Sequence, residues 1–271
     1  LGASRAVYGA AQRAAGPASM NALSPSSPSG LYLHVPFCIR KCVYCDFASR
    51  PLADGGIERF LQALERELAL RPHGFAPATV YIGGGTPTAL PESALERLLA
   101  LVREAAAPEH IVEWTCEANP GTLTAEKARA LRAAGVNRLS IGAQSFDDAR
   151  LRQLGRIHTA NDIREAVAIA RNAGFENLSL DVMYALPGAS LSDWNRDLDE
   201  ARALRPPHIS LYALSVEDGT AFARERAVGR LVEADEETAR AQYDAARAAL
   251  TADGFAQYEI SNFAWPGRES R

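Results

Sequence analysis

The sequence predicts an α/β fold in which six strand–helix units form a barrel-like parallel sheet with the helices outside. Two observations predict it. Short apolar runs alternate with helical patterns from residue 31 onward, an order that implies parallel strands joined by right-handed crossovers. Nearly every predicted strand also ends in residues suited to chemistry, and α/β barrels carry their sites at the carboxyl ends of the strands. A doubly wound open sheet fits the periodicity equally, but the converging polar groups favour a full or partial barrel.

The individual elements follow from composition and period. Six runs of apolar, β-branched or aromatic residues predict strands at 31–36, 79–83, 111–117, 138–142, 178–184 and 208–213. Apolar residues at a 3.6-residue spacing predict helices at 57–70, 93–103, 125–134, 161–173, 191–204 and 236–253. Gly135 and Gly174 stand just past two of these helices, where C-terminal caps are common. One further strand is predicted at 255–263.

Composition divides the chain into two regions. Residues 1–30 are rich in Ala, Ser, Pro and Gly and lack the apolar side chains that would offset the entropy of ordering. We therefore expect a disordered N-terminal tail. Residues 31–271 are expected to form one domain, because a chain of 271 residues with 47% hydrophobic side chains can bury a large core.

Charge and hydropathy exclude several classes of partner. The 29 basic and 33 acidic side chains leave a net charge of −4, which gives no electrostatic reason to expect nucleic acid or an anionic membrane. No apolar run approaches the roughly 20 residues of a membrane span, so no transmembrane segment is expected. The four cysteines are few for the length and no secretory signal is visible, so we expect a cytoplasmic protein.

Three of the four cysteines, Cys38, Cys42 and Cys45, follow directly on the first predicted strand. Their Cys-x3-Cys-x2-Cys spacing offers three thiolates from one loop, enough to hold three irons of a four-iron, four-sulfur cluster and leave the fourth iron open. A zinc ion with His34 as fourth ligand is an alternative, although His34 lies on a strand, which makes that geometry awkward. Such a site would define a non-catalytic, zinc-stabilised barrel. Disulfide partnership is disfavoured by the expected reducing compartment.

Polar groups also gather at the ends of other predicted strands. The run Gly83-Gly84-Gly85-Thr86-Pro87 lets the backbone approach a ligand closely, because no side chains intervene at the glycines. Glu117 and Asp181 lie at or near the ends of apolar strands, where an unpaired carboxylate is costly. A ribose hydroxyl or an ammonium group would satisfy them, and an arginine partner, Arg138 or Arg156, is the alternative.

Four other residues in these segments have roles that can be predicted from their side chains and positions. Gln144 and Arg156 can donate to a ribose and to a carboxylate respectively, arginine through a two-pronged contact. Cys116 precedes Glu117 on a strand, so the two side chains face opposite ways, and we expect Cys116 to be a buried, inert thiol. His158 either lines the site or lies on the surface before a helix.

The cysteine spacing resembles the signature of the radical S-adenosylmethionine (SAM) superfamily, and further segments resemble its coproporphyrinogen-oxidase-like branch. These segments are LYLHVPFC at 31–38, GGGTPT at 83–88, LGRIH at 154–158, Asp181 with LPG at 186–188, ISLY at 209–212 and YEISNF at 258–263. The resemblance implies a partial (βα)6 TIM-like barrel of the radical SAM type. It also implies that residues 31–271 are the radical SAM core and that the smaller C-terminal domain of the branch is absent from this chain.

The resemblance further implies a [4Fe–4S] cluster on the three cysteines and a SAM site beside it. Tyr32 would lie near the start of that site, and Tyr44 would contact the adenine. The methionine end would be bound by Gly84, Gly85 and Thr86. The amino-acid and ribose groups would be held by Glu117, Gln144, Arg156 and Asp181, and the match at Ser215 is looser.

Phe47 distinguishes two members of the branch. The oxygen-independent coproporphyrinogen III oxidases carry a further cysteine two positions after the third, where this chain has Phe47. The Cys-Asp-Phe ending is similar to HemW-type heme chaperones, which deliver heme to acceptor proteins such as respiratory enzymes. The resemblance therefore favours a heme-binding chaperone, with an oxidase acting on a porphyrinogen as the alternative. It does not decide whether the protein is an enzyme.

Overall fold

The computed structural model describes residues 29–52, 56–71 and 75–271, and its centre is an eight-stranded sheet. Six parallel strands stand side by side in chain order, which confirms the predicted α/β class. They are β1 (Gly30–Val35), β4 (Thr79–Gly84), β5 (Glu113–Ala118), β6 (Arg138–Gln144), β7 (Asn177–Tyr184) and β8 (His208–Ala213). The predicted tail falls almost entirely outside the described residues.

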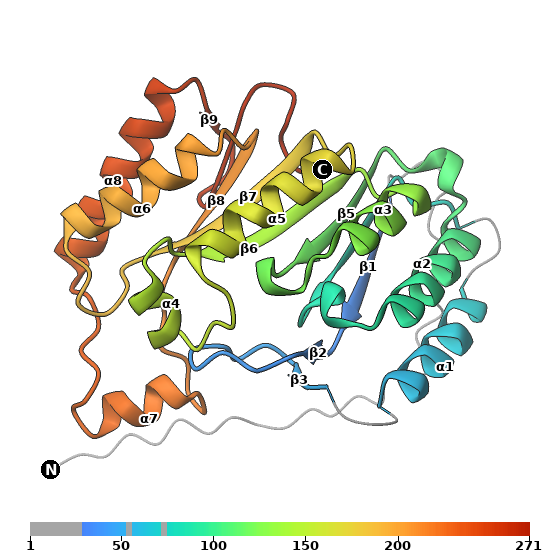
Figure 1. Ribbon diagram of the computed structural model, residues 1–271, viewed down its shortest axis with the longest axis horizontal. Coiled ribbons are helices and arrows are strands. Elements are labelled where there is room, and N and C mark those ends of the chain that lie inside the picture. The colour runs from blue at the N-terminus through green and yellow to red at the C-terminus, as the bar shows by residue number, and fades with distance from the viewer. Residues whose placement is uncertain (1–28, 53–55, 72–74) are drawn as a thin grey trace, which may run out of the picture.

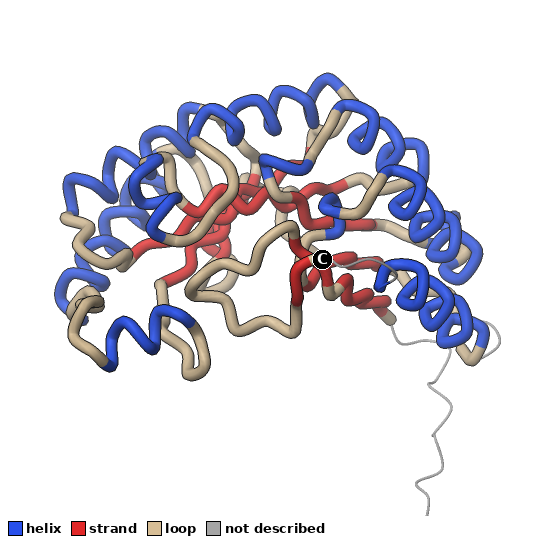
Figure 2. The backbone as a smooth tube through the Cα atoms, turned by 60° about the horizontal axis from the view of Figure 1, so that its bottom comes forward, coloured by secondary structure: helices blue, strands red, loops and turns tan. Residues whose placement is uncertain are grey.

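The longer helices cover the convex side of this curved sheet (Figure 2). The six that the periodicity predicts are α1 (Gly56–Ala69), α2 (Glu92–Ala106), α3 (Ala125–Ala134), α5 (Ala160–Asn172), α6 (Leu191–Ala203) and α8 (Glu236–Ala252). Thr159 and Ser190 start α5 and α6 through capping boxes with Asp162 and Asp193. Single 3-10 turns occupy Pro87–Ala89, Pro108–His110 and Pro120–Thr122.

The prediction of one further strand within 255–263 is wrong. The structure has two short strands there, β9 (Ala256–Gln257) and β10 (Asn262–Ala264), which pair antiparallel with each other, and β10 runs antiparallel to β8. A turn at 258–261 reverses the chain, with the Asn262 N–H donating to the Glu259 carbonyl oxygen over 3.2 Å. The short helices α4 (Asp148–Gln153) and α7 (Ala221–Ala227) were not predicted, because neither is long enough to show a helical period.

The two faces of the sheet differ in chemistry. On β7, the side chains of Leu178, Leu180 and Val182 are buried in the hydrophobic core beneath the helices. The alternate residues Ser179 and Asp181 face the concave side, because neighbours on a strand point in opposite directions. On β7 the concave side therefore carries polar groups, with Met183 next to them in the cavity wall.

The sheet does not close into a full barrel. Its strand order runs from β1 at one edge to β9 at the other, and the two edges are not hydrogen-bonded to each other. The cysteine loop, flanked by β2 (Phe37–Cys38) and β3 (Arg50–Pro51), lies below the carboxyl ends of the strands in Figure 1. The architecture is thus the expected partial barrel with a loop across one end.

Candidate cofactor site

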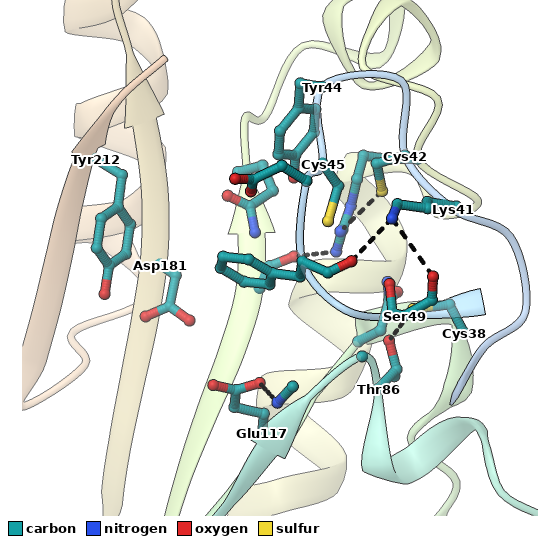
Figure 3. A pocket seen from close by; sticks show the side chains of 18 of the residues that line it. Cys38, Lys41, Cys42, Tyr44, Cys45, Ser49, Thr86, Glu117, Asp181 and Tyr212 are labelled. Carbon is teal, nitrogen blue, oxygen red and sulfur yellow. Dashed lines mark hydrogen bonds between the residues drawn. The ribbon is translucent and has the colours of Figure 1, made fainter. Parts of the chain in front are cut away.

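A cavity of about 360 Å³ opens at the carboxyl ends of the strands, between them and the cysteine loop. Figure 3 shows the loop cysteines on one side of it and Asp181 and Tyr212 on the other, with Glu117 below them. The structure brings eleven of the twelve predicted site residues together here. They are Cys38, Cys42, Tyr44, Cys45, Gly84, Gly85, Thr86, Glu117, Gln144, Arg156 and Asp181.

Tyr32 is the exception, because it does not line this cavity. It lies on the edge strand β1 with 59% of its surface exposed, and its hydroxyl is 3.0 Å from His34 Nδ1. Its ring stacks on Tyr81, its register partner on β4, with 6.0 Å between ring centroids. Tyr81 is the one of the two that reaches the cavity wall.

Backbone hydrogen bonds fasten the cysteine loop to the barrel. At its ends, the Arg50 N–H donates to Pro36 O over 3.0 Å and the Leu52 N–H donates to Cys38 O over 2.9 Å. In its middle, the Val43 N–H donates to Leu154 O over 3.2 Å, and the Val43 carbonyl accepts from Phe222 N of α7 over 3.0 Å. These backbone hydrogen bonds therefore hold the loop from both sides.

Two side chains add to this fastening. Lys41 Nζ donates to the Phe47 carbonyl over 2.8 Å, which folds the loop back on itself (Figure 3). His34 Nε2 lies 2.9 Å from Ala48 O, while its Nδ1 faces Tyr32. Both ring nitrogens of His34 are thus engaged, so the zinc site with His34 as a ligand finds no support.

The three loop thiols are half-buried and free of disulfides. Arg156 Nη1 lies 3.5 Å from Cys42 Sγ, Thr86 Oγ1 lies 3.8 Å from Cys38 Sγ, and burial raises the pKa of Cys45. Within the described ranges, no three His, Cys, Asp or Glu side chains converge as ligands of a single ion would. A four-iron cluster is instead anchored at separate irons, so its thiolates stay apart, and the donor set fits such a cluster.

Glu117 is held by neutral donors. Its Oε1 accepts from the Tyr81 hydroxyl over 2.8 Å and its Oε2 accepts from the Gly84 N–H over 3.1 Å. Burial is the main reason that its pKa rises to about 7, and the nearby Asp181 charge adds to the rise. A cation entering the cavity would stabilise the ionised form.

Asp181 has similar surroundings on β7. Ser140 Oγ donates to both of its oxygens over 3.0 Å, Ser179 Oγ lies 3.4 Å from Oδ1, and burial raises its pKa. Neither Arg138 nor Arg156 forms an ion pair with Glu117 or Asp181 in the part of the chain that the structure describes. No arginine therefore bonds directly to either carboxyl group among these residues, although the charge of Arg138 opposes the rise in the pKa of Asp181.

A bulge at the end of β6 presents Gln144 to the cavity. The register with β7 shifts between Ile141 and Gln144, and Gln144 adopts a left-handed φ of 67°. Arg156 Nη2 donates to the Gly142 carbonyl in this bulge over 2.8 Å. The Arg156 Nε is buried without an acceptor among the described residues.

The glycine turn is needed for packing as well as for ligand access. A Cβ at Gly85 would lie 2.5 Å from the Phe37 carbonyl oxygen, and one at Gly83 would lie 2.7 Å from Glu117 Oε1. The N–H groups of Gly85 and Thr86 donate to Val35 O and Phe37 O over 2.8 and 2.7 Å. Because these N–H groups are occupied, the turn offers a ligand its carbonyl oxygens.

The structure also places Cys116, His158 and Ser215. Cys116 is fully buried in the core, as expected. His158 is neither exposed nor part of the cavity lining, since it is buried with its nitrogens 3.1 Å from Asn119 Oδ1 and Ala143 O. Burial lowers its pKa to about 4. Ser215 does line the cavity, and its Oγ donates to Glu217 over 2.7 Å.

Sequence reasoning missed other residues of the cavity wall, among them Tyr81, Ser140, Met183 and Tyr212. The sequence does contain a pattern that indicates two of these residues, Ser140 and Tyr212. Polar and apolar residues alternate along Arg138–Gly142 and His208–Tyr212, so one face of each strand is polar. Reading these runs as wholly apolar strands concealed the face that the cavity uses.

Comparison with known proteins defines the class. The model of the radical SAM superfamily matches residues 32–201. This chain belongs to the radical SAM superfamily, whose members bind a [4Fe–4S] cluster and SAM.

Particular relatives narrow the resemblance. The chain is 40% identical to the heme chaperone HemW of Bacillus subtilis over 244 residues, 89% of this chain and 64% of the relative. It is 41% identical to HemW of Mycobacterium tuberculosis over 253 residues, 91% of this chain and 65% of the relative. Among solved structures, coproporphyrinogen III oxidase (HemN) from Escherichia coli superposes with a TM-score of 0.80 at 27% identity, covering 90% of this chain and 57% of that one. The chain thus spans about two-thirds or less of each of these proteins.

None of the helices in the described ranges is both long enough and apolar enough to cross a membrane.

Proposed function

We propose that this protein is a SAM- and [4Fe–4S]-binding heme chaperone of the HemW type, which binds heme and delivers it to acceptor proteins such as respiratory enzymes. The observation that carries the proposal is Phe47, which lines the cavity two positions after Cys45. A phenyl ring neither ligates metal nor donates hydrogen as a thiol does, so an oxidase that uses a cysteine there would lack it. The identity of 36–41% to HemW proteins of several bacteria supports the same proposal.

The proposed roles follow the cavity wall. Cys38, Cys42 and Cys45 hold the cluster, and Arg156 neutralises thiolate charge beside Cys42. Tyr44 contacts the adenine, and the turn of Gly84, Gly85 and Thr86 receives the ammonium group of SAM on its carbonyls. The ribose and the amino-acid end are held by Glu117, Gln144, Arg156 and Asp181. When bound, a reduced cluster supplies the electron for reductive cleavage of SAM.

The proposed setting is the cytoplasm, with heme as cargo. The net charge of −4 gives no reason to expect nucleic acid as a partner. This chain spans about 64% of the length of the HemW protein it matches. Heme transfer should therefore be tested with the whole protein as well as with this chain.

One anaerobic experiment separates the chaperone from the oxidase. Cluster-reconstituted protein is titrated with heme and followed by the Soret band, and a parallel sample receives SAM, a reductant and coproporphyrinogen III. Saturable heme binding with intact coproporphyrinogen is the expected result. Loss of carbon dioxide from the porphyrinogen, with 5′-deoxyadenosine formed, would make the protein an oxidase and overturn the proposal.

A further inference from the structure

A line of hydrogen bonds runs from the cofactor cavity to the opposite end of the barrel. Ser179 Oγ lies 3.4 Å from Asp181 Oδ1 and 2.7 Å from His208 Nδ1. His208 Nε2 in turn lies 2.7 Å from the hydroxyl of Tyr258. Ser179 and His208 are buried, whereas 37% of Tyr258 is exposed at the amino-terminal end of the strands. The line therefore joins a carboxyl group of the cavity to a side chain that solvent reaches.

Counting protons fixes the direction of these bonds. Burial and the nearby Arg138 charge lower the pKa of His208 to about 3, so its ring is neutral and has a single N–H. Tyr258 accepts from the Ser270 N–H over 3.1 Å, so its own proton is free to go to His208 Nε2. His208 then donates from Nδ1 to Ser179, and the Ser179 hydroxyl points to the Asp181 carboxylate. A proton on Asp181 would reverse every bond in the line.

We propose that Ser179, His208 and Tyr258 form an internal proton relay that exchanges the proton of Asp181 with solvent at the amino-terminal end of the barrel. In the outward direction the Asp181 O–H bond breaks and a new O–H forms on Ser179, whose own proton passes to His208 Nδ1. The proton on His208 Nε2 passes to the Tyr258 oxygen, and the phenolic proton passes to water. No electron moves, and each relay residue ends with its original number of protons.

The relay is needed when a ligand occupies the cavity. Asp181 lines the cavity, so a ligand there closes the direct route between this carboxyl group and solvent. The inference rests on the proposed function in one respect, namely that SAM is this ligand. The charged and titratable groups around Asp181 are Glu117 on β5, Arg138 on β6, Tyr81 on β4 and Tyr212 on β8. The sulfonium charge of SAM favours the carboxylate, so binding drives out any proton that Asp181 carries beforehand.

Rapid-mixing infrared spectroscopy on cluster-loaded protein tests the relay. SAM is mixed in, and loss of the protonated carboxyl band of Asp181 is followed, with the band identified by its absence in Asp181→Asn. Tyr258→Phe removes one hydroxyl from the line and keeps the ring that packs edge-on against His208. We expect this variant to lose the band at least tenfold more slowly than the parent protein, with unchanged amplitude.

Tyr243→Phe is the matched control. Its hydroxyl donates to the Ile260 carbonyl over 2.8 Å and so anchors the same C-terminal segment without being part of the line. We expect the parent rate in this variant. Equal slowing in both variants, a parent rate in Tyr258→Phe, or SAM binding with no loss of the band would each overturn the relay while SAM binding stands. A parent protein that fails to bind SAM would overturn the proposed function and the relay with it.

Discussion

Arg156 joins the cysteine loop to the end of β6. One terminal nitrogen lies 3.5 Å from Cys42 Sγ and the other donates to the Gly142 carbonyl over 2.8 Å. The guanidinium is the one cation that hydrogen-bonds a loop thiol within the described ranges, and burial around it strengthens its interaction with thiolate charge. Arg156 thus connects the proposed cluster to the proposed SAM site.

Arg156→Gln should loosen the cluster. A hydrogen bond to a charged group contributes about 1.5–3 kcal/mol, so we expect iron release to a chelator to accelerate by roughly tenfold or more. The loss of cluster absorbance over time measures it. Arg152→Gln, an exposed arginine on α4 just before the turn that carries Arg156, is the control and should release iron at the parent rate. Equal rates in all three proteins would remove Arg156 from this role.

Cys42→Ala should abolish the cluster, because two thiolates cannot anchor the four-iron unit. Iron and acid-labile sulfide are measured after anaerobic reconstitution, and we expect both to fall to background. Cys116→Ala removes a thiol that is fully buried outside the cavity and should keep the parent content. A brown, sulfide-containing Cys42→Ala protein would refute the assignment of the loop.

Asp181→Asn should separate the two cofactors. The amide cannot offer a second anionic oxygen to a ribose or ammonium group, so SAM affinity should fall by about 1–3 kcal/mol, or roughly tenfold to a hundredfold. Cluster content should persist, since the cysteines lie across the cavity (Figure 3). Calorimetry with SAM and an iron assay on the same sample give both quantities. Unchanged affinity would remove Asp181 from the SAM site.

Glu117 predicts a pH dependence with a definite sign. Its folded-state pKa of about 7 stands above the ordinary 4.5, so the folded state binds more protons than the unfolded state between these values. The free energy of unfolding of the cluster-free protein should therefore fall as pH rises from about 4.5 through 7, by up to about 3 kcal/mol. Denaturant titrations at several pH values measure it, and Glu117→Gln should flatten the dependence. An equally steep curve in that variant would contradict the assignment.

Gly85→Ala should be strongly destabilising. The new Cβ would lie 2.5 Å from the Phe37 carbonyl oxygen, which is backbone and cannot move aside without displacing the start of the cysteine loop. We expect a loss of about 1–3 kcal/mol and poor cluster incorporation. Gly121→Ala is the matched control, since its Cβ would meet nothing closer than 3.5 Å. Thermal denaturation compares the two, and similar melting temperatures would refute the packing argument.

The sequence reveals the fold well because the parallel strands and their helices carry local signals. Apolar runs and helical periods recur at regular intervals, and caps such as Gly135 mark helix ends. The prediction for residues 255–263 was wrong because a two-residue and a three-residue strand are too short to show any period. Only the pairing of β10 with β8 and of β9 with β10 defines them. Helices α4 and α7 were not predicted for the same reason, because each is too short to show a period.

The site divides along a similar line. The cysteines and the glycine turn can be recognised in the sequence by their spacing. Tyr81 and Ser140 can be recognised only from their hydrogen bonds in the structure, to Glu117 and to Asp181 respectively. Tyr32 shows what a motif match leaves open. It lies outside the cavity lining, which its register partner Tyr81 joins, but it is close enough to Glu117 for that charge to raise its pKa in addition to the effect of burial. A contact between Tyr32 and SAM stays a prediction.

The backbone contacts of the cysteine loop tie it to two separate parts of the chain. Val43 is bonded on one side to Leu154 and on the other to Phe222 of α7. Contacts that fix the backbone reduce the conformational entropy that a loop can lose when it binds a ligand. A change that displaces Leu154 or Phe222 should therefore move the chain between Cys42 and Cys45 without altering either thiol.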